Sequence, residues 1–171
     1  MKQDRASADP DGRAAFASFR IVMQLEAKHL TPARHVIANI AQSIDLDAEV
    51  ASRLALAAHE LLENAVKYSA AADRQVLLRL SIVRGSKASV TVCNASSREI
   101  YQRMQRRLRR LNRETDAAAY YQALIVRTMA RQTGSGLGLA RIRAEAEMKL
   151  YCAFRGDVLS VRAELTTGAS R

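Results

Sequence analysis

Two pairs of apolar, β-branched runs joined by short turn segments constrain the fold of this chain most. The runs "QVLLRLSIV" (75–83) and "ASVTVCN" (88–94) are joined through Arg84-Gly85-Ser86-Lys87. A later stretch, "YCAFRGDVLSVRAEL" (151–165), turns at Gly156-Asp157. Short connections of these residue types favour β-hairpins, in which neighbouring strands run antiparallel. The sequence therefore predicts a sheet that is mixed but mainly antiparallel.

Helical segments are grouped between these strands, after an expected first strand at 19–25. Thr31-Pro32 is typical of a helix start, and the helix is expected to reach about Ser43. Its apolar side chains recur at helical spacing and are expected to be buried: Val36, Ile37, Ile40 and Ile44. Further helices are expected over roughly 47–69, within 98–130, and again in "ARIRAEAEMKL" (140–150). This order favours an α/β fold, a two-layer sandwich in which helices cover the sheet.

The length of 171 residues predicts one domain. We expect a flexible leader over 1–14, a single domain over 15–166 and a flexible tail over 167–171. No apolar run approaches the ~18 residues of a membrane span, and the first residues lack a secretory apolar segment. Cys93 and Cys152 lie in apolar stretches, which favours buried free thiols in a reducing compartment. A cytoplasmic protein without a membrane partner is expected.

The stretch "HELLENAVKYS" (59–69) places several polar groups within three helical turns. A zinc-protease helix would need a second histidine four residues after His59, where Glu63 stands. His59-Glu60 also resembles a phospho-acceptor box, although the helix continues directly into further polar residues. Asn64 follows Glu60 by four residues, and Lys67 and Tyr68 follow next, so one face carries them all. By itself this pattern is also that of an ordinary solvated helix face.

A second stretch, "TGSGLGLARI" (133–142), is a glycine-rich loop that opens a helix. Such a loop exposes backbone N–H groups toward an anion. A Rossmann loop is disfavoured, because no strand directly precedes the glycines. Taken together, the two stretches resemble the N-box and the second glycine box of the GHKL (histidine kinase-like) ATPase superfamily. The resemblance covers about residues 19–165, and within the superfamily the chain is similar to stand-alone anti-sigma factor serine kinases and SiaB-like partner-switching kinases.

The resemblance implies the Bergerat (GHKL) fold, with ATP and Mg²⁺ as cofactors. It implies that Asn64 is a Mg²⁺ ligand, that Glu60 orients or deprotonates the attacking hydroxyl, and that Lys67 reaches a phosphate. Tyr68 would pack near the adenine. The phosphates would be cradled by the glycine loop, which comprises Thr133, Gly134, Ser135, Gly136, Leu137 and Gly138.

One part of the family pattern is replaced. The family usually carries Asp-x-Gly-x-Gly after the second strand of the first hairpin, and here that place holds "NASSR" (94–98). Asn94 would stand for the adenine-reading Asp, and Ser96 and Arg98 for the glycines. Asn can accept from the adenine amino group and donate to a ring nitrogen. The change predicts weakened ATP binding.

Seven of the residues from 98 to 113 are arginines, in a chain of net charge +10: Arg98, Arg103, Arg106, Arg107, Arg109, Arg110 and Arg113. They lie in the region, about 98–133, where the family carries its ATP lid. Their helix would bury an apolar stripe of Tyr101, Met104, Leu108 and Leu111. The arginines form a solvated face, a lid or docking surface for an acidic protein, or a nucleic-acid site; nucleic acid is disfavoured, since only one helix is strongly basic and no aromatic platform accompanies it.

The resemblance thus implies an ATP-dependent protein serine/threonine kinase that binds and phosphorylates a STAS-type antagonist in bacterial signalling. The alternatives are a catalytically impaired protein of the same fold that sequesters a sigma factor or another regulator, and a His59 phospho-relay protein. A homodimer is compatible with the resemblance.

Overall fold

A single antiparallel sheet forms the centre of the protein. The computed structural model describes residues 17–24, 30–44, 46–69, 75–83, 86–131 and 136–166. The sheet has the strand order β1-β2-β3-β5-β4, and each neighbouring pair is antiparallel. The strands are β1 (Ala17–Gln24), β2 (Gln75–Val83), β3 (Lys87–Ala95), β4 (Lys149–Arg155) and β5 (Val158–Thr166). The two predicted hairpins are β2–β3 and β4–β5, and both are confirmed.

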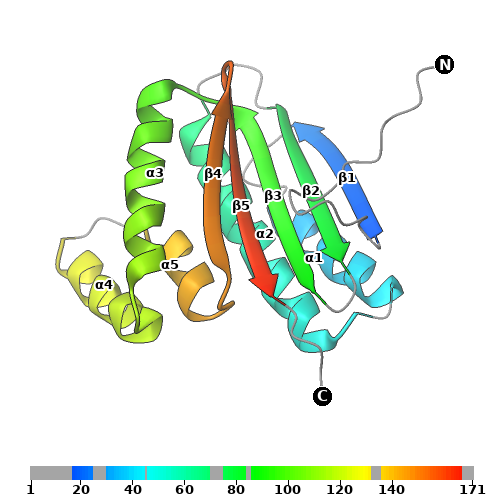
Figure 1. The fold of residues 1–171 in the computed structure, drawn as a ribbon, viewed down its shortest axis with the longest axis horizontal. Helices are drawn as coiled ribbons and strands as arrows, with labels where there is room; N and C mark the ends of the chain where they lie inside the picture. The colour runs from blue at the N-terminus through cyan, green and yellow to red at the C-terminus, as the bar shows by residue number, and fades with distance from the viewer. Residues whose placement is uncertain are drawn as a thin grey trace.

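Helices cover one face of this sheet. They are α1 (Leu30–Ser43), α2 (Ala48–Tyr68), α3 (Arg98–Arg113), α4 (Ala117–Arg131) and α5 (Leu137–Ala144). Figure 1 shows α1 and α2 behind the sheet, with α3 beside its β4 edge. Along β2 and β3 every second side chain is buried, as expected for strands with one packed and one solvated face. The predicted two-layer α/β architecture is confirmed.

The central helix α2 begins where its sequence favours a start. The carboxylate of Asp47 accepts the backbone N–H groups of Glu49 (2.9 Å) and Val50 (3.1 Å), which lack partners within the helix. Leucines at 54, 61 and 62 are almost fully buried against the sheet. This packing fixes the orientation of α2 and with it the positions of its polar residues.

Helix α3 closes the β4 edge of the sheet. The side chain of Asn112 donates to the carbonyl of Leu150 (2.6 Å) and accepts its N–H (3.1 Å), so a carboxamide takes the place of a neighbouring strand. Tyr101 stacks on Phe154 of β4, with ring centroids 5.6 Å apart. The predicted apolar stripe of α3 is confirmed, because Met104, Leu108 and Leu111 are buried and Tyr101 packs against the core.

Two helix predictions need correction. The helical spacing of 98–130 belongs to two helices, since the chain is extended at Glu114 and the Asp116 carboxylate caps a new helix through the N–H of Ala119 (2.8 Å). The helix expected over 140–150 ends at Ala144. Glu147 then adopts a left-handed conformation (φ 53°), and the following residues enter β4.

Two burial predictions also need correction. Val36 is 43% exposed, whereas its neighbour Ile37 is fully buried. The buried stripe of α1 passes through Ala33 and Ile37, and one residue along a helix turns the side chain by about 100° out of that stripe. Cys93 and Cys152 are free thiols but only partly buried. The expected leader (1–14) and tail (167–171) lie outside the described residues, and none of the described helices is long and apolar enough to cross a membrane.

Candidate functional site

The polar face of α2 meets the start of α5 at Glu60. This carboxylate is 5% exposed, and its Oε1 accepts a hydrogen bond from Arg141 Nη1 at 3.2 Å. Gly138, in the first turn of α5, lies directly against the carboxylate, and a Cβ at this position would collide with Oε2. The two stretches that sequence analysis singled out, about seventy residues apart, are therefore adjacent in space.

Burial and the neighbouring cations act on the pKa of Glu60 in opposite directions. Burial raises the pKa of the Glu60 carboxyl, and the nearby charge of Glu63 raises it further, while Arg141 and His59 oppose the rise. Arg141 is held from its other side by Glu145 at 2.8 Å. The pair thus keeps a buried carboxylate in contact with a fixed cation.

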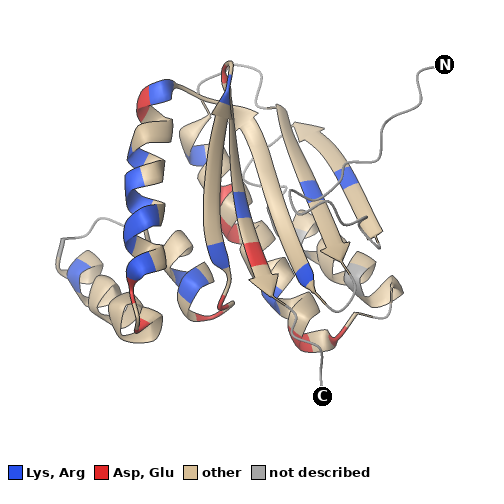
Figure 2. Ribbon diagram, in the orientation of Figure 1, with Lys and Arg blue, Asp and Glu red and all other residues tan. Residues whose placement is uncertain are grey.

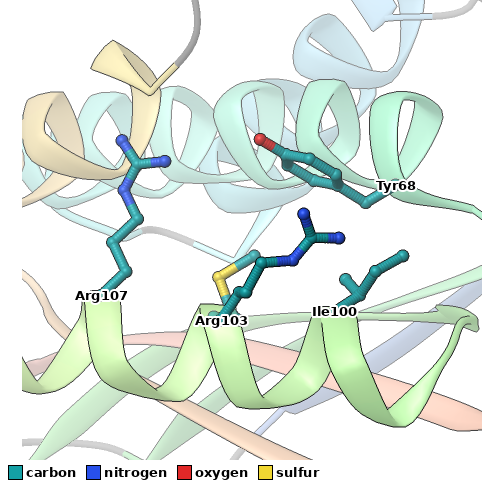
Figure 3. Close-up of a pocket in the computed structure, with 5 residues that line it drawn as sticks. Tyr68, Ile100, Arg103 and Arg107 are labelled. Carbon is teal, nitrogen blue, oxygen red and sulfur yellow. The ribbon is translucent and has the colours of Figure 1, made fainter.

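Asn64 follows one turn later along α2. Its Nδ2 donates to the backbone carbonyl of Glu60 at 2.7 Å, which leaves Oδ1 as the atom for a ligand. Lys67 is exposed, with its ammonium 6.0 Å from the centroid of the Tyr68 ring. Tyr68 itself is half-buried, and its ring lies along α2 in the space between α2 and α3 (Figure 3).

Part of the glycine-rich segment frames this site. Thr133, Gly134 and Ser135 lie outside the described residues. Gly136 is the N-cap of α5, in a left-handed conformation (φ 110°) that favours glycine, and no side chain caps the helix there. Leu137 and Gly138 form the first turn. Helix N-termini without such a cap present N–H groups that suit an anion.

Two cavities lie between α2 and α3. The larger has a volume of about 160 Å³ and is lined by Tyr68, Ile100, Arg103, Met104 and Arg107 (Figure 3). The smaller, of about 10 Å³, is lined by Leu61, Asn64, Ala65, Tyr68, Val92, Asn94, Met104, Leu159 and Val161. Tyr68 and Met104 border both, so the cavities are neighbours with a shared wall.

The segment that replaces the first glycine box leads directly into α3. Asn94 is buried, and its Nδ2 donates to the carbonyl of Ala95 at 3.0 Å. The hydroxyl of Ser96 donates to the carbonyl of Tyr68 at 3.3 Å, and its amide donates to the carbonyl of Asp157 at 2.8 Å. Ser97 then caps the helix by accepting the N–H of Ile100. Without glycines, this part of the chain is a helix start packed against the end of α2.

One arginine of the cluster in α3 lies at the site, and the others lie on the surface. Figure 2 shows Lys and Arg gathered along α3. Arg107 is half-buried and donates to the carbonyl of Gly136, which ties α3 to the start of α5. The remaining arginines of α3 are exposed: Arg98, Arg103, Arg106, Arg109, Arg110 and Arg113.

Three residues at the site were not anticipated as site residues from the sequence. Met104 was assigned only to an apolar stripe, Arg107 only to a charge cluster, and Arg141 to no role. Arg141 follows Gly138 by three residues, and this helical spacing was the available signal for a neighbour of the same ligand.

Comparisons with known proteins agree with this arrangement. Residues 23–147 match the model of the histidine kinase-like ATPase domain. A chain of the SiaB-SiaC complex from Pseudomonas aeruginosa is similar in structure, with a TM-score of 0.66 and 15% sequence identity, over 88% of this chain and 91% of that chain. At this identity the likeness shows the fold alone. Among curated protein sequences none matches.

The family match spans most of the chain and contains both stretches that carried the GHKL resemblance, which is thereby confirmed. The chain belongs to the histidine kinase-like ATPase domain family.

Proposed function

We propose that this protein binds Mg-ATP between α2, α3 and α5 and transfers the γ-phosphoryl group to a serine or threonine of a STAS-type partner. The observation that carries the proposal is the contact between buried Glu60 and Gly138 at the start of α5. It brings a candidate base to a helix terminus suited to phosphate. The family supplies the reaction type, and the fold shared with a chain of the SiaB-SiaC complex supports a role in partner switching.

The polar groups present suit the metal and the phosphates of the nucleotide. Asn64 offers a hard oxygen ligand, since its Nδ2 is already engaged with Glu60. Gly136 and Gly138 lie at the start of α5, with the Arg107 guanidinium against the first and the Glu60 carboxylate against the second. Together with Thr133, Gly134, Ser135 and Leu137 they would hold the phosphates, and bound Mg²⁺ would neutralise developing charge.

The remaining roles follow from position along α2 and β3. Tyr68 would pack on the adenine from the α2 side, and Asn94 would read its edge from the small cavity. Lys67 would reach a phosphate from the exposed side of α2. Each of these assignments is a proposal that a single substitution tests.

The chemical step requires one base and one aligned hydroxyl. The partner's hydroxyl oxygen forms a bond to the γ-phosphorus while the bond from that phosphorus to the β–γ bridging oxygen breaks, and ADP leaves. The hydroxyl proton passes to the Glu60 carboxylate. Burial raises the pKa of Glu60, which makes it a stronger base, and Arg141 favours its ionised form.

The exposed arginines of α3 supply a surface for an acidic partner. Six guanidinium groups lie on one helix beside the larger cavity, and opposite charges accelerate association and orient the partner. We assign this surface to the STAS-type partner rather than to nucleic acid.

One observation favours a second candidate function. The cavity beside Asn94 has about 10 Å³, which is room for about one water molecule. A protein of this fold that binds nucleotide poorly would act by sequestering a sigma factor or another regulator, without phosphorylating it.

Intact-mass measurement separates the candidates. The protein is incubated with Mg-ATP and purified candidate STAS-domain proteins, and each mass is then determined. We expect one phosphate on the partner and none with Glu60→Ala. A stable complex without phosphate on either protein would favour the sequestering function. A phosphate on His59 would favour the phospho-relay reading.

A further inference from the structure

Met104 of α3 forms part of the wall between the two cavities. It is 6% exposed and borders both cavities, together with Tyr68. On the side of the small cavity lie Asn64 and Asn94, the two carboxamides expected to face the nucleotide. On the other side lie Arg103 and Arg107, which reach from α3 toward α2 (Figure 3). A ligand that contacts both groups must pass the shared wall, which Met104 and Tyr68 form.

The volumes of the two cavities show that neither has room for a nucleotide. The cavity at Asn94 has about 10 Å³ and the neighbouring one about 160 Å³. Sites for small molecules and cofactors usually offer about 300–1,000 Å³. Neither cavity alone accommodates a nucleotide, and they merge only when a side chain of their shared wall, Met104 or Tyr68, moves.

Other contacts hold Met104 in this place. One turn along α3, Arg107 donates to the carbonyl of Gly136 at the start of α5. Two turns further, Asn112 is bound to Leu150 by two hydrogen bonds. At the beginning of the helix, Ser97 caps α3 directly after Ser96 contacts Tyr68. Because α3 is tied at three points, its backbone is fixed, and the flexible methionine is the part that can yield.

We propose that Met104 sets the affinity of this protein for the nucleotide base, by filling the space that the base enters between Asn94 and Tyr68. The inference rests on the proposed function, since it concerns the same nucleotide. It attributes weak nucleotide binding to one side chain of α3, in addition to the replaced residues 94–98. Arg107 lies three residues further along the same face, so the phosphate side and the base side of the site are joined through one helix.

Substitution of Met104 tests the inference in both directions. Calorimetric titration with Mg-ATP is expected to give about tenfold tighter binding for Met104→Ala than for the wild type, since the two cavities then join. Met104→Phe is expected to abolish binding, since the larger ring closes the space further. Met104→Val shortens the side chain with a smaller loss of packing, and it replaces the alanine variant if that variant unfolds.

Leu108→Ala is the matched control. Leu108 lies one turn further along the same buried stripe, is 3% exposed, and borders neither cavity. Its truncation loosens α3 to a similar degree and is expected to leave the affinity for Mg-ATP as in the wild type. If Leu108→Ala tightens binding as much as Met104→Ala, general loosening of the helix explains the gain and the inference is overturned.

A methyl NMR measurement observes the residue itself. With ¹³C-methyl methionine in the wild-type protein, the Met104 signal is expected to shift on addition of Mg-ATP. Met148 is fully buried outside both cavities, and its signal is expected to stay in place.

The outcomes separate this inference from the proposed function. If the wild type binds Mg-ATP while Met104→Ala binds no more tightly and the Met104 signal does not move, the inference fails and the proposed function stands. If none of the proteins binds millimolar Mg-ATP, including Met104→Ala, the nucleotide function fails and the inference fails with it. Binding by Met104→Ala alone supports both.

Discussion

Arg141 and Glu60 form an ion pair that joins α5 to α2, with Nη1 of the arginine 3.2 Å from Oε1 of the carboxylate. The carboxylate is nearly inaccessible, whereas the side chain of Arg141 is 41% exposed and also binds Glu145. Because the buried carboxylate depends on a half-exposed partner, it affects the stability of the protein and the dependence of that stability on pH. It also limits which side chains fit at neighbouring positions.

We expect Arg141→Gln to lower the free energy of unfolding by about 1–3 kcal/mol, because it leaves the Glu60 carboxylate buried without its charged partner. Because the side chain of Arg141 is partly exposed to solvent, this loss of stability is expected to be smaller than for a fully buried ion pair. Urea denaturation at neutral pH measures it. Glu145→Gln, which removes only the exposed contact, is expected to lower stability by no more than about 0.5 kcal/mol; equal losses for the two variants would contradict this account.

The stability contributed by Glu60 is expected to fall as the pH rises. Burial and Glu63 raise the pKa of this carboxyl above its ordinary value of 4.5, while Arg141 and His59 partly oppose them. The folded protein therefore binds the proton more tightly than the unfolded chain. The sign follows: this contribution is fully present below pH 4.5 and is lost as the pH rises through the raised pKa of the folded state.

Urea denaturation of the wild type and Glu60→Gln over a pH series measures this contribution as the difference between the two proteins. The wild type is expected to lose stability relative to Glu60→Gln as the pH rises from 4.5, and in the Arg141→Gln background the loss is expected to extend to higher pH. A difference that is constant with pH would show that Glu60 titrates as it does in the unfolded chain.

Gly138→Ala is expected to destabilise the protein by about 1 kcal/mol, because its Cβ displaces the buried Glu60 carboxylate from Arg141 and this loss exceeds the ~0.5–1 kcal/mol that alanine gains over glycine in a helix. In a Glu60→Ala background most of this loss should disappear, and a double-mutant cycle measured by denaturation gives the coupling.

Gly156→Ala serves as the comparison. A Cβ there meets no atom within 4 Å, but the residue has φ 61°. Its loss, about 1–2 kcal/mol from backbone strain alone, should be the same in both backgrounds. If the Glu60→Ala background does not relieve the Gly138→Ala loss, the collision is not its cause.

Asn112→Ala is expected to reduce stability by about 1–3 kcal/mol, since it removes two hydrogen bonds and leaves the N–H and carbonyl of Leu150 without these partners. Gln102→Ala, an exposed position on the same helix, should change stability by less than about 0.5 kcal/mol. Chemical denaturation of both variants checks this, and hydrogen exchange at the Leu150 amide should accelerate only in Asn112→Ala.

The two hairpins and the polar spacing within α2 could be predicted from local sequence, whereas the convergence of α2 with α5 was expected only from the resemblance to GHKL ATPases. Hairpin turns define their own strand pairs, and the polar spacing of Glu60, Asn64 and Tyr68 is a property of one helix. The split between α3 and α4 was missed because both helices keep their apolar spacing across the break. Only the cap at Asp116 marks the second start.

The part of the site contributed by α3 was not predictable from one sequence. Met104 and Arg107 reach the site because α3 packs beside β4 and against the end of α2, and that placement depends on tertiary contacts such as Asn112 with Leu150. A methionine in an apolar stripe has the same pattern whether it faces a solid core or a ligand cavity. Position in space, not periodicity, distinguishes the two.

The carboxamide of Asn112 also limits how copies of this protein can assemble. An open sheet edge invites another strand, but along β4 that role is taken by a side chain and by the helix that carries it. In the described part of the chain, β1 is the edge with no neighbour beyond β2. Addition of a strand beside β4 would have to displace Asn112 from Leu150, so of the two edges in the described part of the chain β1 is the one better suited to pair with another strand.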